Sequence, residues 1–236
     1  MIDMGKKVAE QLVDTLIEAG VRRIYAVTGD SLNEVNEAVR QNEAMKWIHV
    51  RHEETGAYAA GAEAQLTGLP GCCAGSSGPG HVHLINGLYD AHRSGAPVIA
   101  IASTIPTGEF GTEYFQETNT IKLFNDCSFY NEVATTPQQF PRMLQSALQT
   151  ATTRKGVAVI GLPGDLAKKP AAQVESSEQI YPLASSVCPA EEDLIRMAGM
   201  LNHYGRITLF CGIGCKGAHE EIIRMSEILG CFGYRI

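Results

Sequence analysis

Apolar residues along this chain follow two different spacings. Val8, Leu12 and Leu16 recur at the spacing of one helix face and predict an amphipathic helix over residues 6–19. The run PVIAIA at residues 97–102 is apolar at every position. Continuous apolar runs of this length are typical of strands that are buried on both faces of a parallel sheet. The chain therefore combines the patterns of surface helices and buried strands.

Taken in chain order, the two patterns alternate over ~165 residues, which predicts an α/β domain built on a mostly parallel, doubly wound, flavodoxin-like sheet. We expect Asp30 or Ser31 to cap the second helix. The expected strands are residues 22–29, 47–50, 71–77, 97–102, 131–134 and 156–163. The expected helices are residues 6–19, 30–42, 53–66, 83–94 and 138–153, with a polar loop at 106–120 followed by a short helix.

The alternation stops after this first domain, for which we expect residues 1–168. Residues 169–190 are rich in Pro, Ser, Gln and Ala without periodicity, which predicts a linker. Residues 191–236 then contain one strand pattern between two helix patterns. So few elements cannot bury a core of their own. We therefore expect residues 191–236 to be the truncated start of a second α/β domain.

Composition and charge exclude several classes of partner. The 236 residues include 19 basic and 26 acidic side chains, so the formal charge of −7 disfavours nucleic acid and anionic membranes. The sequence also contains no apolar run near the ~20 residues that cross a bilayer, and its charged amphipathic start does not resemble a secretory signal. These features predict a soluble, cytoplasmic protein.

The cysteines and histidines give no metal-binding pattern. Seven cysteines are an odd number, and most lie in apolar runs, so we expect reduced, buried thiols rather than a disulfide framework. Cys211 and Cys215 lack a second ligand pair nearby. Four histidines are interpreted as structural because their spacing is not that of metal ligands: His52, His81, His83 and His92.

Two segments of the first domain could carry chemistry. The loop GSSGPG at 75–80 lies between a predicted strand and a helix, where backbone N–H groups attract anions; it could equally be a plain tight turn. Glu53 and Glu54 follow a strand at the sheet edge where α/β proteins bind ligands, and such a carboxyl could hold a proton for donation. The alternative is that both acids only complement the helix dipole.

Two further segments are weaker signals. GIGCKG at 212–217 fits the Gly-x-Gly-x-x-Gly pattern after a strand, which alone would suggest nicotinamide or flavin binding. YFQET at 114–118 places a Phe beside a Gln in a polar loop, either as a substrate wall or as an anchor of the loop to the core.

Five segments together resemble one family. VTGDSLNEVNEAV, RHEETGAYAAGAEAQLTG, AGSSGPGHVHLINGLYDAHRSGAPVIAIAS, EYFQET and GVAVIGLPGDLA are similar, in this order, to the pyrimidine-binding domain of thiamine-diphosphate-dependent 2-oxo-acid enzymes. The flanking residues most resemble the pyruvate oxidase type, the acetate-forming pyruvate:quinone dehydrogenases. Acetolactate synthases share the glutamate, the Gly-Pro-Gly loop and the Phe-Gln pair, but these flanks less closely.

The resemblance implies roles for individual residues. Glu53 matches the catalytic glutamate that hydrogen-bonds N1′ of the aminopyrimidine, so that the ring can deprotonate C2 of the thiazolium. Phe115 and Gln116 match the pair that lines the reacting centre. The residues matching the cofactor-binding loops are Gly29, Asp30, Gly78, Pro79 and Gly80 for the pyrimidine, and Gly212, Gly214 and Gly217 for the start of the FAD-binding domain.

The resemblance also implies what this chain lacks. The family holds Mg²⁺ and the diphosphate through a Gly-Asp-Gly motif followed by Asn-Asn, and no such motif occurs here. We therefore expect the N-terminal part of a divided active site, inactive alone and retaining no cofactor. The apolar face that pairs in the family predicts a homodimer or a higher homo-oligomer.

The implied reaction is oxidative decarboxylation of pyruvate to acetate, with electrons passing through FAD to quinone and with a location at the membrane periphery in full-length relatives. Acetolactate-forming carboligation and a non-catalytic dimerising fragment remain alternatives. A nicotinamide-binding protein ranks last, because it leaves RHEE and the Gly-Pro-Gly loop unexplained.

Overall fold

The structure, a computed structural model, describes residues 5–172, 187–231 and 233–235. Contacts within the chain define two compact units, Met1–Ser185 and Ser186–Ile236, and each is described by itself. Most of the predicted linker, residues 173–186, lies outside the described residues.

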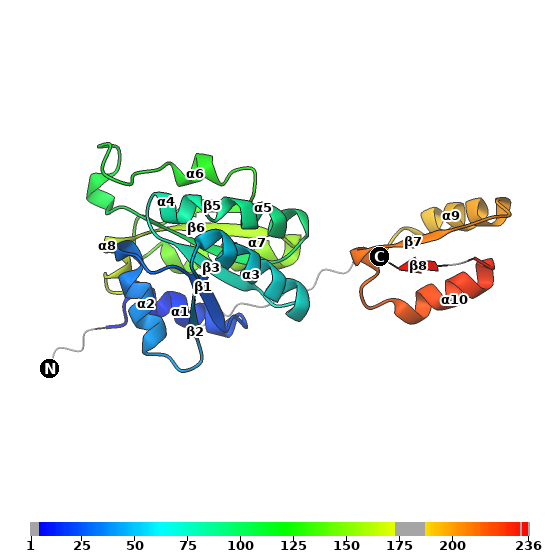
Figure 1. Cartoon of the computed structure of the whole chain (residues 1–236), viewed down its shortest axis with the longest axis horizontal. Helices are drawn as coiled ribbons and strands as arrows, with labels where there is room; N and C mark the ends of the chain where they lie inside the picture. The colour runs from blue at the N-terminus through cyan, green and yellow to red at the C-terminus, as the bar shows by residue number, and fades with distance from the viewer. Residues whose placement is uncertain (1–4, 173–186, 232, 236) are drawn as a thin grey trace. The chain divides into compact units, whose positions relative to one another are not determined.

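The first unit is built on a six-stranded sheet in which every strand pair is parallel (Figure 1). The strand order is β2-β1-β3-β4-β6-β5. This confirms the predicted doubly wound α/β class. The strands are β1 (Arg23–Ala26), β2 (Lys46–His49), β3 (Gly71–Gly75), β4 (Val98–Thr104), β5 (Tyr130–Val133) and β6 (Val157–Pro163).

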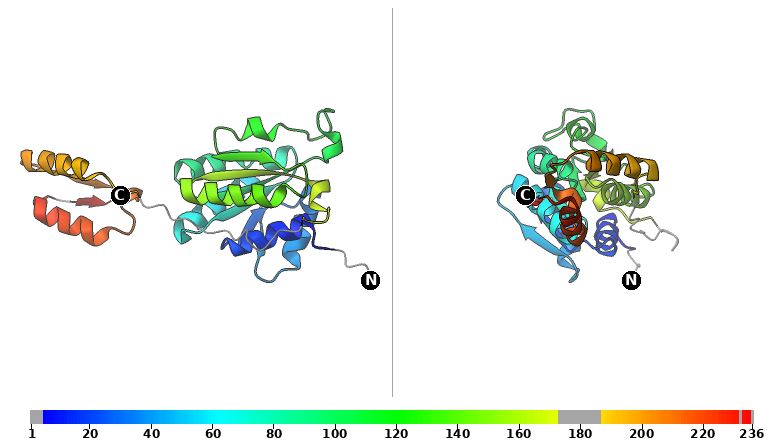
Figure 2. Two further views of the ribbon diagram at one scale, coloured as in Figure 1. Left: turned by 180° about the vertical axis from the view of Figure 1, so that it is seen from behind. Right: turned by 90° about the vertical axis from the view of Figure 1, so that its right-hand side faces the viewer.

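Helices cover both faces of the sheet, as the views from the two sides show (Figures 1 and 2). Side chains of β4 alternate between two cores, Ile99 and Ile101 entering one, Val98 and Ala100 the other. The first core is covered by α1 (Val8–Glu18), α2 (Asn33–Arg40), α7 (Phe140–Arg154) and α8 (Gly164–Ala167). The second core lies under α3 (Glu53–Thr67), α5 (Ile85–Arg93) and α6 (Thr120–Leu123), and the short helix α4 (Pro79–Val82) precedes α5.

Helix α3 approaches the sheet very closely because small residues line its contacts. A Cβ atom at Gly71, on β3, would lie 2.1 Å from the carbonyl oxygen of Ala60 in α3. A Cβ at Gly87, on α5, would lie 2.6 Å from the Cβ of Ala57. The glycines and alanines of this region therefore determine how deeply α3 is seated, and with it the position of the first residue of α3, Glu53.

Two local predictions were wrong. Neither Asp30 nor Ser31 caps the second helix, because a 3-10 turn, η1 (Asp30–Leu32), intervenes and α2 begins after Leu32. The Ser31 hydroxyl instead accepts a hydrogen bond from the backbone N–H of Ser77 at 3.0 Å. The helix predicted over residues 83–94 begins earlier and is divided into α4 and α5.

The described residues of the second unit form two α-helices and two short parallel strands. The unit contains α9 (Glu191–His203), β7 (Leu209–Cys211), η3 (Ile213–Cys215), α10 (His219–Leu229) and β8 (Gly233–Arg235). The pairing of β7 with β8 was not predicted, because the sequence after Leu229 lacks the apolar run of a buried strand. Among the described residues of the whole chain, no helix has both the length and the apolar character needed to span a bilayer.

The cysteines are all free thiols, and three of them, Cys72, Cys73 and Cys127, are buried. Burial raises the pKa of Cys73 to about 12 and that of Cys127 to about 11. These thiols therefore remain protonated at neutral pH, as expected for buried, reduced cysteines. Cys188 is exposed, and Cys211, Cys215 and Cys231 are partly exposed. The prediction that the cysteines are buried is therefore wrong for these four.

We expect Gly71→Ala to destabilise the first unit by about 1–3 kcal/mol, because the added methyl group must displace either β3 or α3. Urea unfolding followed by circular dichroism measures this change. Gly108→Ala is the matched control, since a Cβ at Gly108 has no atom within 4 Å. Equal unfolding midpoints for the two variants would contradict the close approach of α3 and β3.

Candidate functional site

The candidate site lies where the strand order reverses. From β1 the chain continues outward to β2, then returns to β3 on the other side of β1. The crevice at the carboxyl ends of such strands is the usual ligand site of open α/β sheets. Gly29 follows β1 and approaches the loop after β3 so closely that a Cβ there would lie 2.5 Å from the Cβ of Ser76. Asp30 begins η1 next to it.

Glu53 is the first residue of α3 and reaches this crevice from the end of β2. It is only 8% exposed. The helix N-terminus favours a carboxylate at this position, and His52 completes the terminus by accepting the N–H of Glu54 on Nδ1 at 3.3 Å. Oε2 of Glu53 lies 3.0 Å from Nδ1 of His83. Glu53 is therefore a buried acid with a histidine as hydrogen-bond partner.

The loop after β3 packs closely against this carboxyl group. A Cβ at Gly80 would lie 3.3 Å from Oε1 of Glu53 and 2.5 Å from the Oγ of Ser76. Pro79 is the first residue of α4. The Gly-Pro-Gly segment thus places the backbone of Gly80, rather than a side chain, against Glu53.

Gln116 and Gly78 interlock. Both have left-handed backbone conformations, with φ of 67° and 68°, and a Cβ at Gly78 would lie 2.7 Å from the Cβ of Gln116. The hydroxyl of Ser77 also donates to Oε1 of Gln116 at 3.1 Å. A left-handed conformation at a non-glycine residue costs on the order of 1 kcal/mol and often marks a functional position. Phe115, in contrast, points outward and is 81% exposed.

The loop that carries Gln116 is anchored near both ends. The Asp165 carboxylate accepts hydrogen bonds from the N–H of Thr107 at 2.9 Å and from its hydroxyl at 2.7 Å. Burial acts to raise the pKa of Asp165, but these hydrogen bonds and Lys169 lower it overall. At the other end, Thr118 contacts Nε2 of His81.

His81 is fully buried under the loop. Its Nδ1 lies 2.8 Å from the carbonyl oxygen of Ser103, which can only accept, so Nδ1 carries the proton and Nε2 accepts from Thr118. Burial lowers the pKa of His81, although the Ser103 carbonyl acts to raise it. The neutral ring therefore holds the loop.

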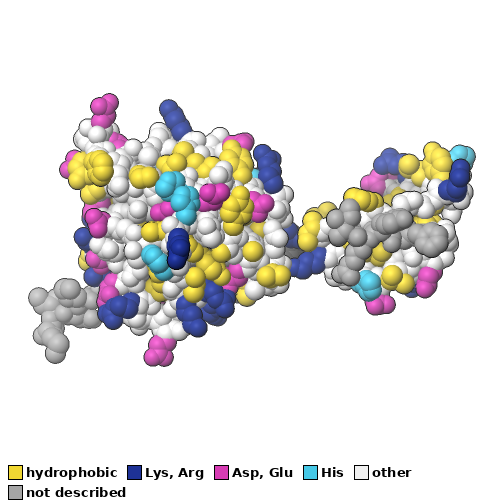
Figure 3. Space-filling view, in the orientation of Figure 1, with side chains coloured by type: hydrophobic (Ala, Val, Ile, Leu, Met, Phe, Trp, Pro, Cys, Tyr) yellow, Lys and Arg dark blue, Asp and Glu magenta, His cyan; other side chains and the backbone are white. Residues whose placement is uncertain are grey.

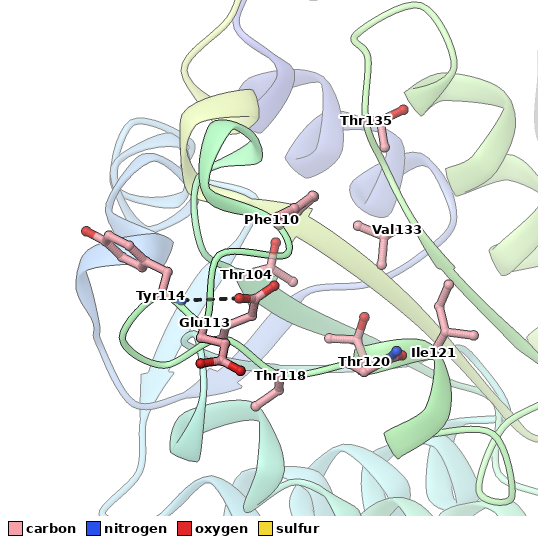
Figure 4. Close-up of a pocket in the computed structure, with 11 residues that line it drawn as sticks. Thr104, Phe110, Glu113, Tyr114, Thr118, Thr120, Ile121, Val133 and Thr135 are labelled. Atoms are coloured by element: carbon pink, nitrogen blue, oxygen red, sulfur yellow. Dashed lines mark hydrogen bonds between the residues drawn. The ribbon is translucent and has the colours of Figure 1, made fainter.

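A cavity of about 670 Å³ lies on the other side of this loop, above the ends of β4 and β5 (Figure 4). Inside the loop, Glu117 accepts the N–H of Tyr114 at 3.2 Å. The cavity is lined by Thr104, Phe110, Glu113, Tyr114, Glu117, Thr118, Asn119, Thr120, Ile121, Val133 and Thr135. It has space for a small organic group.

The structure brings most, but not all, of the sequence-predicted site residues together. Glu53, Gly80, Gly78 and Gln116 meet at the switch point. The glycines Gly212, Gly214 and Gly217 belong to the second unit, where a Cβ at any of them would meet no atom within 4 Å.

His83, His52 and Ser77 were not predicted as site residues. Thirty residues separate His83 from Glu53, so no local spacing indicates their contact. The one available signal was the position of His83 three residues after the Gly-Pro-Gly segment.

Comparison with known proteins gives a family match. Residues 6–123, half of the chain, match the family model for the thiamine pyrophosphate enzyme, N-terminal TPP binding domain. The chain is 50% identical over 228 residues to an uncharacterized 42.6 kDa protein of Pseudomonas amyloderamosa. It is 35% identical over 213 residues to pyruvate oxidase of Lactiplantibacillus plantarum, and 28% identical over 234 residues to a chloroplastic acetolactate synthase of Arabidopsis thaliana.

These matches cover 94%, 89% and 97% of this chain, but only 57%, 35% and 35% of the relatives. The chain thus spans about half or less of the length of these relatives.

We expect the first unit to lose stability as the pH falls below about 6.5, the ordinary pKa of histidine. Below this pH His81 binds a proton in the unfolded chain, whereas burial in the folded state opposes its protonation. The contribution of His81 to the free energy of unfolding is therefore complete above about pH 6.5 and decreases below it. The measurement is urea unfolding at several pH values for the wild type and His81→Gln. The free-energy difference between the two should shrink toward pH ~5.

His49→Gln is the control, because His49 is exposed. If the difference between the wild type and His81→Gln is the same at every pH, His81 is not the group that titrates.

Proposed function

Because the chain belongs to the thiamine pyrophosphate enzymes, through their N-terminal TPP binding domain, we propose that it carries the part of an active site that activates thiamine diphosphate for attack on pyruvate. The observation that carries this proposal is Glu53, 8% exposed at the carboxyl edge of the sheet and facing the backbone of Gly80. When bound, thiamine diphosphate supplies an electron sink for decarboxylation.

The residues at the switch point fit the aminopyrimidine end of this cofactor. A buried carboxyl can share a proton with a ring nitrogen more effectively than an exposed one, because little water competes for it. Gly80 presents only backbone to the carboxyl, so no side chain at this position stands between Glu53 and a flat ring. In the proposal Glu53 holds the proton at N1′, Gly29, Asp30, Gly78, Pro79 and Gly80 surround the ring, and Gln116 and Phe115 line the reacting centre.

The full reaction that we propose is oxidative decarboxylation of pyruvate to acetate, with FAD and then quinone as electron acceptors, in a cytoplasmic protein. Support comes from the 35% identity with a pyruvate oxidase and from the flanks of RHEE and YFQET. In the family, Mg²⁺ and the diphosphate are held by a Gly-Asp-Gly motif that this sequence does not contain. We therefore propose that this chain supplies only the pyrimidine-binding half, without activity of its own.

Carboligation to acetolactate is the alternative reaction, supported by the 28% identity with an acetolactate synthase. The two reactions share the same use of Glu53 and differ in what accepts the activated two-carbon unit. Product analysis with and without an electron acceptor therefore discriminates between them.

We also propose that the chain forms a homodimer. The loop that carries Gln116 and the helix α6 that follows it expose four large apolar side chains, which a partner of the same kind would cover. They are Phe110, Tyr114, Phe115 and Ile121.

We expect Glu53→Gln, introduced in a complete homologous enzyme, to lower decarboxylation by about 10²- to 10⁴-fold, because an amide cannot take and return a proton at the ring. Steady-state turnover of pyruvate measures this loss. Glu54→Gln is the matched control. Glu54 follows Glu53 directly in the chain, its side chain is 36% exposed, and it has no role in the proposed function. Near-normal turnover of Glu53→Gln would remove Glu53 from the mechanism.

We expect no saturable binding when this 236-residue chain is titrated calorimetrically with thiamine diphosphate and Mg²⁺. The reason is that the charged diphosphate finds no recognisable ligands here. Tight binding that depends on Mg²⁺ would overturn the proposal that the chain supplies only half of a site.

A further inference from the structure

Three metal-ligating side chains converge at the N-terminus of α3. One ligand atom from each of His52, Glu53 and His83 lies within 4.8 Å of the others. The imidazole rings of His52 and His83 are stacked, with centroids 4.4 Å apart and an interplanar angle of 26°. Figure 3 shows a face of the first unit on which histidine side chains lie beside acidic ones.

The separations are close to those of a metal site. Around a tetrahedral ion with bonds of about 2.0–2.1 Å, neighbouring ligand atoms are roughly 3.3 Å apart. Oε2 of Glu53 and Nδ1 of His83 already lie 3.0 Å apart. The side chain of His52 is 48% exposed, so it can rotate over the remaining distance without disturbing the core.

His52 must exchange one hydrogen bond to become a ligand. Its Nδ1 accepts the backbone N–H of Glu54 at 3.3 Å, so this nitrogen has a lone pair and no proton. Ligation through Nδ1 replaces that hydrogen bond with a bond to the ion, and Nε2 keeps the proton that a metal-bound histidine donates to an outer partner. The carboxylate of Glu54, with Oε2 3.8 Å from Nδ1, lies beside the ring.

The donor set selects a class of metal. Two imidazoles and one carboxylate suit zinc and its neighbours, whereas Mg²⁺ and Ca²⁺ prefer oxygen ligands alone and Cu⁺ prefers sulfur. The side chain of Glu53 is 10% exposed and those of the two histidines are 48% and 42% exposed, so solvent can fill the open coordination position. The positive end of the α3 dipole opposes a cation, and the ionised Glu53 and Glu54 offset it.

We propose that His52, Glu53 and His83 bind a divalent transition-metal ion of the zinc class. The ion takes the place of the proton between Glu53 and His83. This site is defined by its own three donors and does not rest on the proposed function. A bound ion would nevertheless occupy the carboxyl group that the proposed function assigns to the aminopyrimidine.

The experiment is calorimetric titration of the full chain with Zn²⁺ in a buffer that does not chelate metals. We expect one saturable site, weakened at least about tenfold by His83→Ala, because the loss of an outer partner alone costs that much. His49→Ala is the matched control, an exposed histidine outside the cluster. Equal affinities of the wild type and His83→Ala, or no saturable binding at all, would overturn the proposal.

Thiols are competing ligands, so a second measurement identifies the donors. Cys211 and Cys215 are partly exposed, and the Cys211→Ser/Cys215→Ser double variant should bind Zn²⁺ as the wild type does. The spectrum of the Co²⁺-substituted chain should lack a thiolate charge-transfer band. Such a band, or loss of binding in the double variant, would assign the metal to the cysteines instead. Circular dichroism of His83→Ala verifies that its fold is intact.

Discussion

The parallel sheet, covered on both faces, is the constraint on which the rest of this structure depends. Because all six strands run in the same direction, their carboxyl ends lie along one edge, and every loop that follows a strand opens there. The strands must then be largely apolar on both faces, and β4 and β6 are buried at every position. The polar and ionisable side chains that could bind a ligand consequently lie in the loops at this edge and in the first turns of the helices.

Close backbone approach gives this edge its shape. The glycines of β3 and α5 allow α3 to sit directly against its neighbours, which carries Glu53 down to the level of the loop after β3. That loop in turn interlocks with Gln116, more than thirty residues further along the chain. Two hydrogen-bonded pairs, Asp165 with Thr107 and His81 with Thr118, hold the second loop in place. A buried acid, a glycine loop and a strained glutamine thus form one cluster, although they come from three segments.

The histidines of this cluster differ in role because their environments differ. His81 is buried, with both ring nitrogens occupied by Ser103 and Thr118, and it stabilises the loop. His83, two residues later, is partly exposed and contacts Glu53. The buried carboxyl of Glu53 is flanked by the exposed side chains of His52 and His83, and the proposed metal site follows from this arrangement.

The sequence by itself determined the fold class, the order of the elements and the family. Apolar runs and helix-spaced residues depend on local burial, and the motifs around Glu53 and the Gly-Pro-Gly segment are contiguous, so both are visible without a structure. The division of the helix after Gly78 and the 3-10 turn at Asp30 were missed, because contacts with distant residues such as Ser77 override local preference there. Only the tertiary structure could place His83 on Glu53 and Gln116 on Gly78. These contacts join residues about thirty or more positions apart, and no periodicity connects positions that meet only when the sheet assembles.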